Sequence, residues 1–123
     1  MRDKSRYILV ESSEDIEKFG IKLNDENASK NFSRVINKYL LFELGDINYT
    51  YANPKVAAIL NNKFFIIKSL LKGTPNLIIA LAFIKQINDV NTAFYTIKTS
   101  GTIRTLKEYA AGLNQNKIID KNK

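Results

Sequence analysis

The sequence predicts a single α+β domain in which two helices cover one face of a four-stranded antiparallel sheet. Four short segments are rich in β-branched and aromatic residues, as is typical of strands. They are residues 6–12, 55–60, 63–70 and 92–99. Three further segments space their apolar residues three and four positions apart, as on one face of a helix. They are residues 32–44, 75–88 and 103–113.

The chain length also favours one domain. With 123 residues, of which 45% are hydrophobic, the chain can bury one core. We expect this domain to span residues 1–113. The remaining residues, 114–123, are polar apart from one Ile-Ile pair, and we expect them to form a frayed tail.

The N-terminal part is predicted to form a strand, a helical turn and a long helix. The strand, residues 6–12, is an apolar run bounded by charges and serines, and the turn after it ends at Gly20. We expect the long helix to begin at Asn24 or Asn27, because asparagine often caps a helix start. It should end at Gly45, since glycine commonly terminates helices.

The middle of the chain is predicted to form a connection and then a hairpin. Residues 46–54 read as an irregular connection, because Pro54 disfavours a helical conformation at the preceding residue. The Asn61-Asn62 pair between the next two strands predicts a tight turn, because asparagine tolerates positive φ.

The second helix is expected to have Thr74 as its cap and Pro75 at its first position, where the missing N–H costs nothing. It should run to about Asn88. A loop over residues 88–91 then leads into the last strand, which turns into the last helix at Ser100-Gly101-Thr102.

The Ser100-Gly101-Thr102 turn allows two interpretations. Lys98 lies just before it, and Arg104 and Lys107 lie just after it. A helix N-terminus has free N–H groups and a partial positive charge, so the turn could hold a phosphate. Alternatively, Gly101 only makes the turn, Ser100 or Thr102 only caps the helix, and the cations are solvated. The residues alone leave both interpretations open.

The order β-α-β-β-α-β is the split βαβ pattern of a ferredoxin-like sandwich, which is also the frame of the RNA-recognition module. Here both sheet faces carry apolar residues, for example Phe64 and Ile66 on one side and Phe65 and Ile67 on the other. Residues 77–84 are apolar on nearly every side of their helix. We therefore expect the C-terminal helix to cover part of the open face. A partner protein or a second copy of the chain should cover the rest.

Composition excludes several kinds of chemistry. The chain has no cysteine and no histidine, which removes thiol catalysis, the serine–histidine triad and nearly all zinc sites. Its net charge is +7, but residues 1–46 carry nine acids and eight bases, whereas residues 47–123 carry three acids and eleven bases. This asymmetry favours an anionic partner for the C-terminal two-thirds. With no signal peptide and no long apolar run, we expect a soluble cytoplasmic protein that does not bind membranes.

Known nucleotide-binding and catalytic motifs fit poorly. The third strand, Lys63-Phe-Phe-Ile-Ile-Lys68, lacks the glycine and one aromatic face that base stacking in an RNA-recognition module needs. The close acid pairs Asp15/Glu17 and Asp25/Glu26 lie near helix starts, where carboxylates favour the dipole, so we expect caps rather than a metal site. We therefore predict no catalytic residue, no bound metal and no bound cofactor in this chain.

Several segments together resemble the family of archaeal ribonuclease P protein component 2, the counterpart of a small eukaryotic ribonuclease P and mitochondrial-RNA-processing subunit. The segments are Arg6-Tyr-Ile-Leu-Val-Glu11, Ala52-Asn-Pro-Lys-Val56, Leu77-Ile-Ile-Ala-Leu-Ala-Phe-Ile84 and, most specifically, Ser100-Gly-Thr-Ile-Arg104. This chain uses lysine where many members favour arginine, notably around Lys68. Lysine lacks the bidentate fork, which affects individual RNA contacts.

The resemblance implies a non-catalytic subunit of an endoribonuclease that removes 5′ leaders from precursor tRNA. It implies that the chemistry belongs to the RNA, with magnesium at the RNA active site. The implied partners are ribonuclease P RNA, other protein subunits and protein component 3, which is a barrel-shaped subunit. The resemblance also implies that two pairs of components 2 and 3 associate through component 2. The candidate RNA-binding residues are Lys98, Ser100, Gly101, Thr102, Arg104 and Lys107, followed by Lys63, Lys68 and Lys72.

The same fold is compatible with two other functions. The first is a regulatory or ligand-binding module that dimerises through its sheet; it would need a pocket with convergent polar groups, which the sequence does not reveal. The second is an acylphosphatase-like enzyme. That enzyme needs a phosphate-cradling loop after the first strand, whereas the chain has the acidic stretch Ser12-Ser13-Glu14-Asp15 there.

Overall fold

The computed structural model describes the backbone of residues 4–121 and the side chains of residues 4–112. Its elements in chain order are β1 (Ser5–Ser12), the 3-10 helix η1 (Ile16–Phe19), α1 (Ala28–Ala52), β2 (Lys55–Ile59), β3 (Phe64–Leu70), the 3-10 helix η2 (Leu71–Gly73), α2 (Thr74–Phe83), β4 (Gln86–Ile87), β5 (Val90–Asn91), β6 (Phe94–Ser100) and α3 (Ile103–Lys121). None of the helices in the described part has the length and apolar character needed to cross a membrane.

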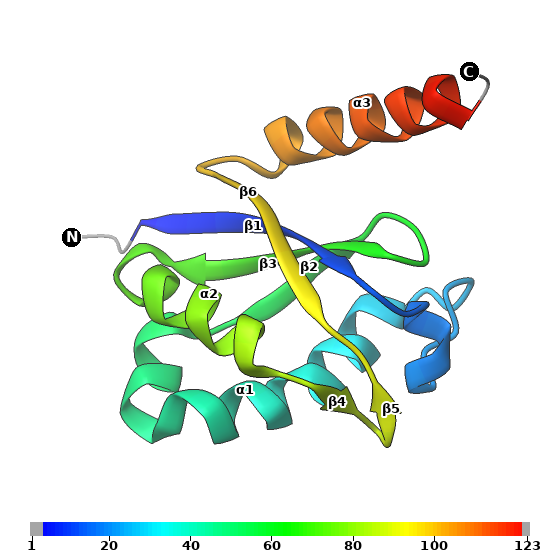
Figure 1. Cartoon of the computed structure of the whole chain (residues 1–123). Helices are drawn as coiled ribbons and strands as arrows, with labels where there is room; N and C mark the ends of the chain where they lie inside the picture. Colours follow the sequence, from blue (N-terminus) through cyan, green and yellow to red (C-terminus); the bar gives the residue numbers. More distant parts are fainter. Residues whose placement is uncertain (1–3, 122–123) are drawn as a thin grey trace.

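The main sheet has the strand order β2-β3-β1-β6, and every neighbouring pair is antiparallel. Helices α1 and α2 lie against one face, while α3 crosses the other face above β1 and β6 (Figure 1). The predicted four-stranded antiparallel α+β sandwich of ferredoxin-like type is therefore confirmed. So is the expectation that the C-terminal helix lies over the open face.

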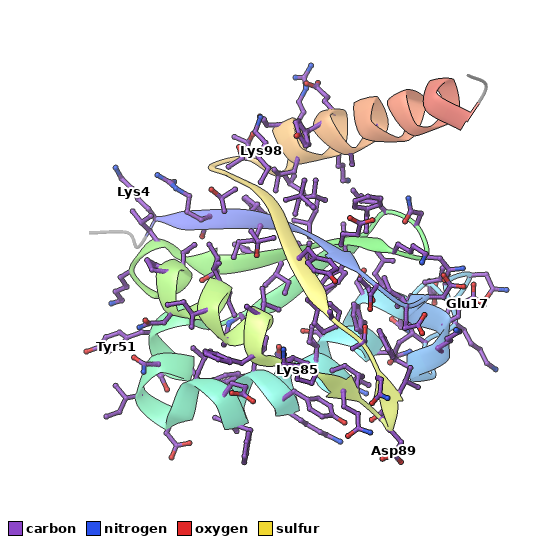
Figure 2. The ribbon with its side chains drawn as sticks, viewed as in Figure 1. Lys4, Glu17, Tyr51, Lys85, Asp89 and Lys98 are labelled. Carbon is purple, nitrogen blue, oxygen red and sulfur yellow. The ribbon has the colours of Figure 1, made fainter. Side chains whose placement is uncertain are left out.

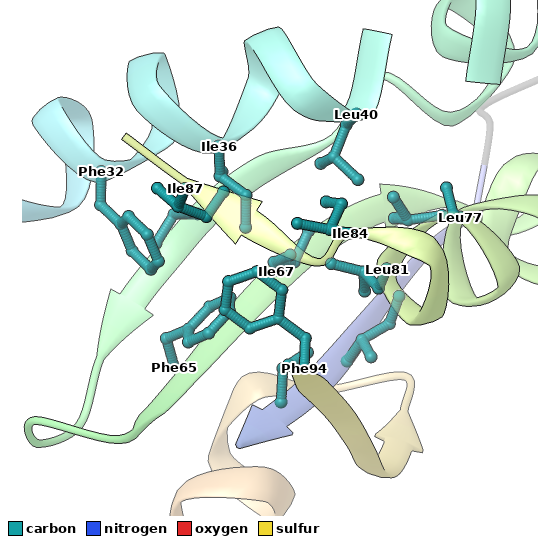
Figure 3. Close-up of a cluster of buried hydrophobic side chains, with 14 of the residues drawn as sticks. Phe32, Ile36, Leu40, Phe65, Ile67, Leu77, Leu81, Ile84, Ile87 and Phe94 are labelled. Atoms are coloured by element: carbon teal, nitrogen blue, oxygen red, sulfur yellow. The ribbon is translucent and has the colours of Figure 1, made fainter. Parts of the chain in front are cut away.

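The larger core lies between the sheet and the two long helices. Phe19, Phe32, Phe65 and Phe94 come from four different elements and form a closed ring of aromatic contacts, with neighbouring ring centroids 4.8 to 6.3 Å apart. Edge-to-face aromatic pairs contribute roughly 0.5–1.5 kcal/mol beyond the area that they bury. Three of these rings appear in Figure 3, among the aliphatic side chains of α1 and α2. The cluster thus joins η1, α1, β3 and β6 into one unit.

The smaller core lies under α3. Leu106 and Ala110 of α3 are buried against Leu9, Phe64 and Ile66 of the sheet. This second layer explains why the strands do not alternate cleanly between apolar and polar residues. Since both faces are covered, both must be apolar.

The long helix α1 continues beyond its expected end. The prediction of a helix boundary at Gly45 is correct locally, because Gly45 has φ 78° and ψ 164°, which is not helical. The prediction that residues 46–54 form an irregular connection is wrong, because a helix resumes at once and runs to Ala52. Pro54 allows this, because the helix has already ended at Asn53, whose φ of 44° is left-handed.

The turn between β2 and β3 forms where it was predicted but by a different mechanism. In the described residues other than glycine, positive φ occurs at Asn53, Asn88 and Asp89, and so not in the Asn61-Asn62 turn. Instead, the Asn61 side-chain oxygen accepts hydrogen bonds from the backbone N–H of Lys63 (2.8 Å) and Phe64 (2.9 Å). Asparagine acts here through its side chain rather than through its tolerance of positive φ.

Helix α2 is shorter than expected, and its start differs. It ends at Phe83 because Ile84 is extended, and residues 86–91 form the β4–β5 hairpin in place of the expected helix end and loop. Thr74 does not cap α2. Its hydroxyl donates to the carbonyl of Leu70 (3.1 Å), and Gly73 occupies the cap position.

The C-terminal segment also differs from expectation. Residues 114–121 were expected to be a frayed tail, but they continue α3 to Lys121. The few apolar residues of this segment did not indicate a helix, and the absence of glycine or proline after Gly112 removes the usual stop signals.

Gly73 supplies a stability test. A Cβ at this position would lie 2.7 Å from the Ala52 side chain and closer still to the Ala52 backbone. Because backbone cannot rotate away, we expect Gly73→Ala to lower the free energy of unfolding by about 1–3 kcal/mol. Urea denaturation measures this change.

Gly112→Ala is the matched control, because nothing lies within 4 Å of a Cβ there and alanine favours a helix. It should leave stability unchanged or raise it. Equal stability of the Gly73 variant and the wild type would contradict the close packing of η2 on the end of α1.

Candidate nucleic-acid interface

The last residues of β6 are positioned by a bulge in its pairing with β1. Leu9 is opposite Lys98, but Val10 is opposite Thr96, so Ile97 is the extra residue. Simple alternation would place Lys98 on the same face as buried Phe94. The bulge shifts it to the α3 face, where its ammonium nitrogen lies 4.5 Å from the centre of the Tyr109 ring.

The Ser100-Gly101-Thr102 turn acts as a helix cap. The Thr102 hydroxyl oxygen accepts a hydrogen bond from the N–H of Thr105 (3.4 Å), and the Ser100 hydroxyl accepts one from the N–H of Thr102 (3.2 Å). Within the described part of the chain, this geometry accounts for two of the N–H groups near the start of α3. The capping interpretation therefore has direct support, and phosphate binding at this turn stays a prediction.

Around this turn, the predicted cations are exposed. Arg104 has a side chain that is 88% exposed and pairs with Glu108 one turn further along α3 (3.1 Å). Lys107 is also exposed. Arg6 reaches the same place from β1, because its guanidinium would lie 3.4 Å from a Cβ on Gly101. Lys98, Arg104, Lys107 and Arg6 thus gather where β6 passes into α3.

The three weaker candidates do not form one site. Lys63 lies at the opposite end of β3 from Lys68, bonded to the carbonyl of Ser13 (3.2 Å) and 3.9 Å from the Asp15 carboxylate. Lys72 lies over the ring of Tyr51, near the end of α1. Lys68 alone shares the α3 face of the sheet with Lys98. Of the nine predicted residues, Lys63 thus lies at the end of the sheet opposite to Lys68 and Lys98.

The strand register adds Lys55 to the candidate residues. Lys55 of β2 pairs directly with Lys68 of β3, and Lys68 pairs with Tyr7 of β1, which in turn pairs with Ser100 of β6. These four residues form one row across the whole sheet. Only the strand register reveals the row, because the sequence separations are 13, 61 and 93 residues; no local motif marks it.

Some of the charged residues lie at opposite ends of the molecule. Lys4 and Lys98 lie at one end, whereas Glu17 and Asp89 lie at the other (Figure 2). Glu14 and Asp15 follow the C-terminal end of β1, where Glu14 lies 3.5 Å from the Lys18 ammonium and Asp15 lies 3.9 Å from the Lys63 ammonium. We refer to the end carrying Lys4, Arg6, Lys55, Lys68, Lys98 and Arg104 as the basic end.

A second surface is apolar. Seven large apolar side chains of the α1–α2 layer are at least 40% exposed, led by Phe42 at 86%, Ile47 at 73% and Phe83 at 60%. Phe42 and Phe83 line the same groove of about 680 Å³, together with polar residues of α1 and of the segment after α2. We refer to this surface as the helix face. Large apolar side chains that remain exposed on one layer of a domain are typical of a protein contact.

Within the residues that the structure describes, no three acidic, histidine or cysteine side chains are placed to hold a metal ion. The geometry instead presents two surfaces on different elements. The basic end fits an anion, and the helix face fits a protein.

Comparisons with known proteins agree with this description. The chain matches the model of the Rpp14/Pop5 family over residues 6–111. Its fold is similar to that of a chain in the cryo-EM structure of yeast ribonuclease MRP, with a TM-score of 0.52 and 8% sequence identity over 99% of this chain and 97% of that chain. No curated protein sequence matches the chain at a significant level.

The fold and its two surfaces define the class as a ferredoxin-like α+β domain. The family match over most of the length then identifies it: this chain belongs to the Rpp14/Pop5 family. The family supplies protein subunits of the ribonuclease P and ribonuclease MRP ribonucleoproteins, which are endoribonucleases. The resemblance to a ribonuclease P subunit, inferred from four short segments, is confirmed.

Thr102→Ala tests the capping role. The variant loses the side-chain oxygen that accepts from Thr105, so we expect α3 to be destabilised by about 0.5–2 kcal/mol. Amide hydrogen exchange at Leu106 and Ala110 measures this locally, and exchange there should be faster than in the wild type. Thr102→Ser keeps the hydroxyl and should restore slow exchange. Unchanged exchange in the alanine variant would show that Thr102 does not hold the helix start.

Proposed function

We propose that this chain is an RNA-binding subunit of ribonuclease P, the ribonucleoprotein that removes 5′ leaders from precursor tRNA. The observation that carries the proposal is the basic end, found on a member of the Rpp14/Pop5 family. Its cations come from β1, β2, β3, β6 and α3, which are distant in the sequence. Surface cations that are brought together in this way suit a polyanion, because each neutralised phosphate releases condensed counterions.

In this proposal the subunit stabilises the folded RNA and takes no part in bond cleavage. Magnesium ions bound by the RNA would supply the chemistry, which is to activate water and to stabilise the leaving oxygen. The lysines and arginines of the basic end bind and position the RNA backbone. Phosphate contacts of this kind fix register and orientation without reading sequence.

The proposed partner for the helix face is ribonuclease P protein component 3. The support is physical, since Phe42 and Phe83 are large, exposed and line one groove, and Ile47 of α1 is exposed as well. Aromatic side chains at such positions dominate the binding energy of many protein interfaces. Other subunits of the complex, self-association of the chain and a cytoplasmic location stay predictions.

Reconstitution tests the proposed function. Ribonuclease P RNA assembled with the other protein subunits, with and without this chain, should differ in the rate of 5′-leader removal at limiting magnesium. The isolated chain should also bind the RNA with an affinity that falls steeply with salt, by roughly 0.7–0.9 log units per log unit of salt for each phosphate contact. Equal processing with and without the chain would refute the assignment.

Arg104→Ala tests RNA binding with a substitution that should not affect folding. Arg104 is exposed, and its pair with Glu108 is of the i,i+4 kind that is worth only a few tenths of a kcal/mol. The variant should therefore fold normally and bind RNA more weakly. A variant that unfolds would mean that Arg104 has a structural role.

A substitution on the helix face tests the protein partner. Phe42→Ser removes an aromatic ring that the isolated domain leaves exposed, so the fold should be unaffected. Binding to component 3, measured by calorimetry, should weaken at least about tenfold if Phe42 is an anchor.

Tyr95→Ser is the matched control, because Tyr95 is an exposed aromatic residue on β6, away from the helix face. It should bind component 3 like the wild type. If both variants bind normally, the helix face is not the docking surface.

A further inference from the structure

A small pocket lies where β1, β2 and β3 meet the end of α1. It has a volume of about 110 Å³ and is lined by Ser5, Asn53, Lys55, Lys68, Ser69 and Leu70. By volume it could hold three or four water molecules at roughly 30 Å³ each, which is the size range of a single phosphate group rather than of an organic ligand. Among residues 4–112, no carboxylate lines it.

Lys55 and Lys68 face each other directly across the β2–β3 pair. Cβ atoms in such pairs are about 4.5–5.5 Å apart, and like charges placed directly opposite destabilise a sheet. Both side chains are exposed, and neither makes a salt bridge within residues 4–112. An anion between the two ammonium groups would offset their mutual repulsion. The cross-strand pairing already places the two lysines side by side.

The carbonyl groups beside the pocket already have donors. The Ser69 hydroxyl lies within hydrogen-bond distance of the carbonyls of Ala52 (3.2 Å) and Leu70 (3.0 Å), and the Leu70 carbonyl also accepts from Thr74 (3.1 Å). The Asn37 amide donates to the carbonyl of Pro54 (3.1 Å). The ammonium groups of Lys55 and Lys68 are therefore not needed to satisfy these oxygens at the end of α1. Both exposed ammonium groups are therefore accessible to an external ligand.

A third cation lies next to the pocket. The carbonyl of Lys4 accepts a hydrogen bond from the N–H of Leu71 (2.7 Å), which holds the chain just before Ser5 beside the end of β3. Lys4 is exposed at the same end of the molecule as Lys98 (Figure 2). The pocket thus opens onto the basic end described above.

We infer that this pocket binds one phosphate group of an RNA backbone, held between the ammonium groups of Lys55 and Lys68. The inference rests on the proposed RNA-binding function and assigns a specific contact to it. It adds Lys55 to the interface. In this inference the phosphate binds between Lys55 and Lys68 rather than at the Ser100-Gly101-Thr102 turn.

The test compares two double variants with the same change of charge. Lys55→Gln/Lys68→Gln removes the pair. Lys22→Gln/Lys30→Gln removes two exposed lysines that lie before and within the first turn of α1. We expect the first variant to bind ribonuclease P RNA about tenfold more weakly, and its slope of log affinity against log salt to fall by about one contact's worth, 0.7–0.9. The second should bind within about twofold of the wild type.

Titration with inorganic phosphate gives an independent readout that needs no RNA. In the wild type, the backbone amide signals of Ser5, Lys55 and Leu70 should shift with added phosphate, and in the Lys55→Gln/Lys68→Gln variant they should not. Shifts confined to the start of α3 would overturn the pocket assignment.

The outcomes separate the two proposals. If the wild type fails to bind RNA, the proposed function fails. If the wild type binds RNA but the two double variants lose affinity equally, or neither loses any, RNA binding stands and the phosphate site is refuted.

Discussion

The structure depends on the burial of β1 from both sides. Ile8, Leu9 and Val10 are each fully buried, with Ile8 and Val10 in the larger core and Leu9 in the smaller one. β1 is also one of the two inner strands of the sheet and pairs with both β3 and β6. Because neither face of this strand tolerates water, α1 and α2 must cover one side and α3 the other. The sheet therefore requires α3 as a third layer that covers its second face.

The same strand determines where the cations lie. The bulge opposite Leu9 and Val10 changes the side of the sheet that the end of β6 presents, and this places Lys98 on the α3 face. The β1–β3 and β2–β3 registers place Lys68 and Lys55 in the same cross-strand row as Tyr7. A basic end assembled from five elements thus follows from strand pairing, whereas the composition revealed only that the C-terminal two-thirds are basic.

The sequence sufficed for the elements with strong periodicity and for their order, because split βαβ topology leaves few alternative arrangements. Prediction from the sequence was wrong where one local pattern is compatible with two structures. Gly45 does break the helix, but a new helix starts immediately after it. The β4–β5 hairpin turns on Asn88 and Asp89, at φ of 48° and 68°, within a segment whose apolar run continued the helical pattern. Lys55 was not among the candidates, because its neighbour across the sheet is set by register, which no local pattern contains.

The two surfaces of this domain belong to opposite layers, which has a mechanical consequence. The helix face is built on α1 and α2, and the basic end is built on the sheet, on β1's first residues and on the start of α3. The larger core lies between the helices and the sheet. It includes the cluster of phenylalanine side chains through which α1 contacts β3 and β6. A protein bound to the helices and an RNA bound to the basic end would therefore not compete for side chains. A domain of this size can hold both at once and fix their relative position, as the proposed function requires.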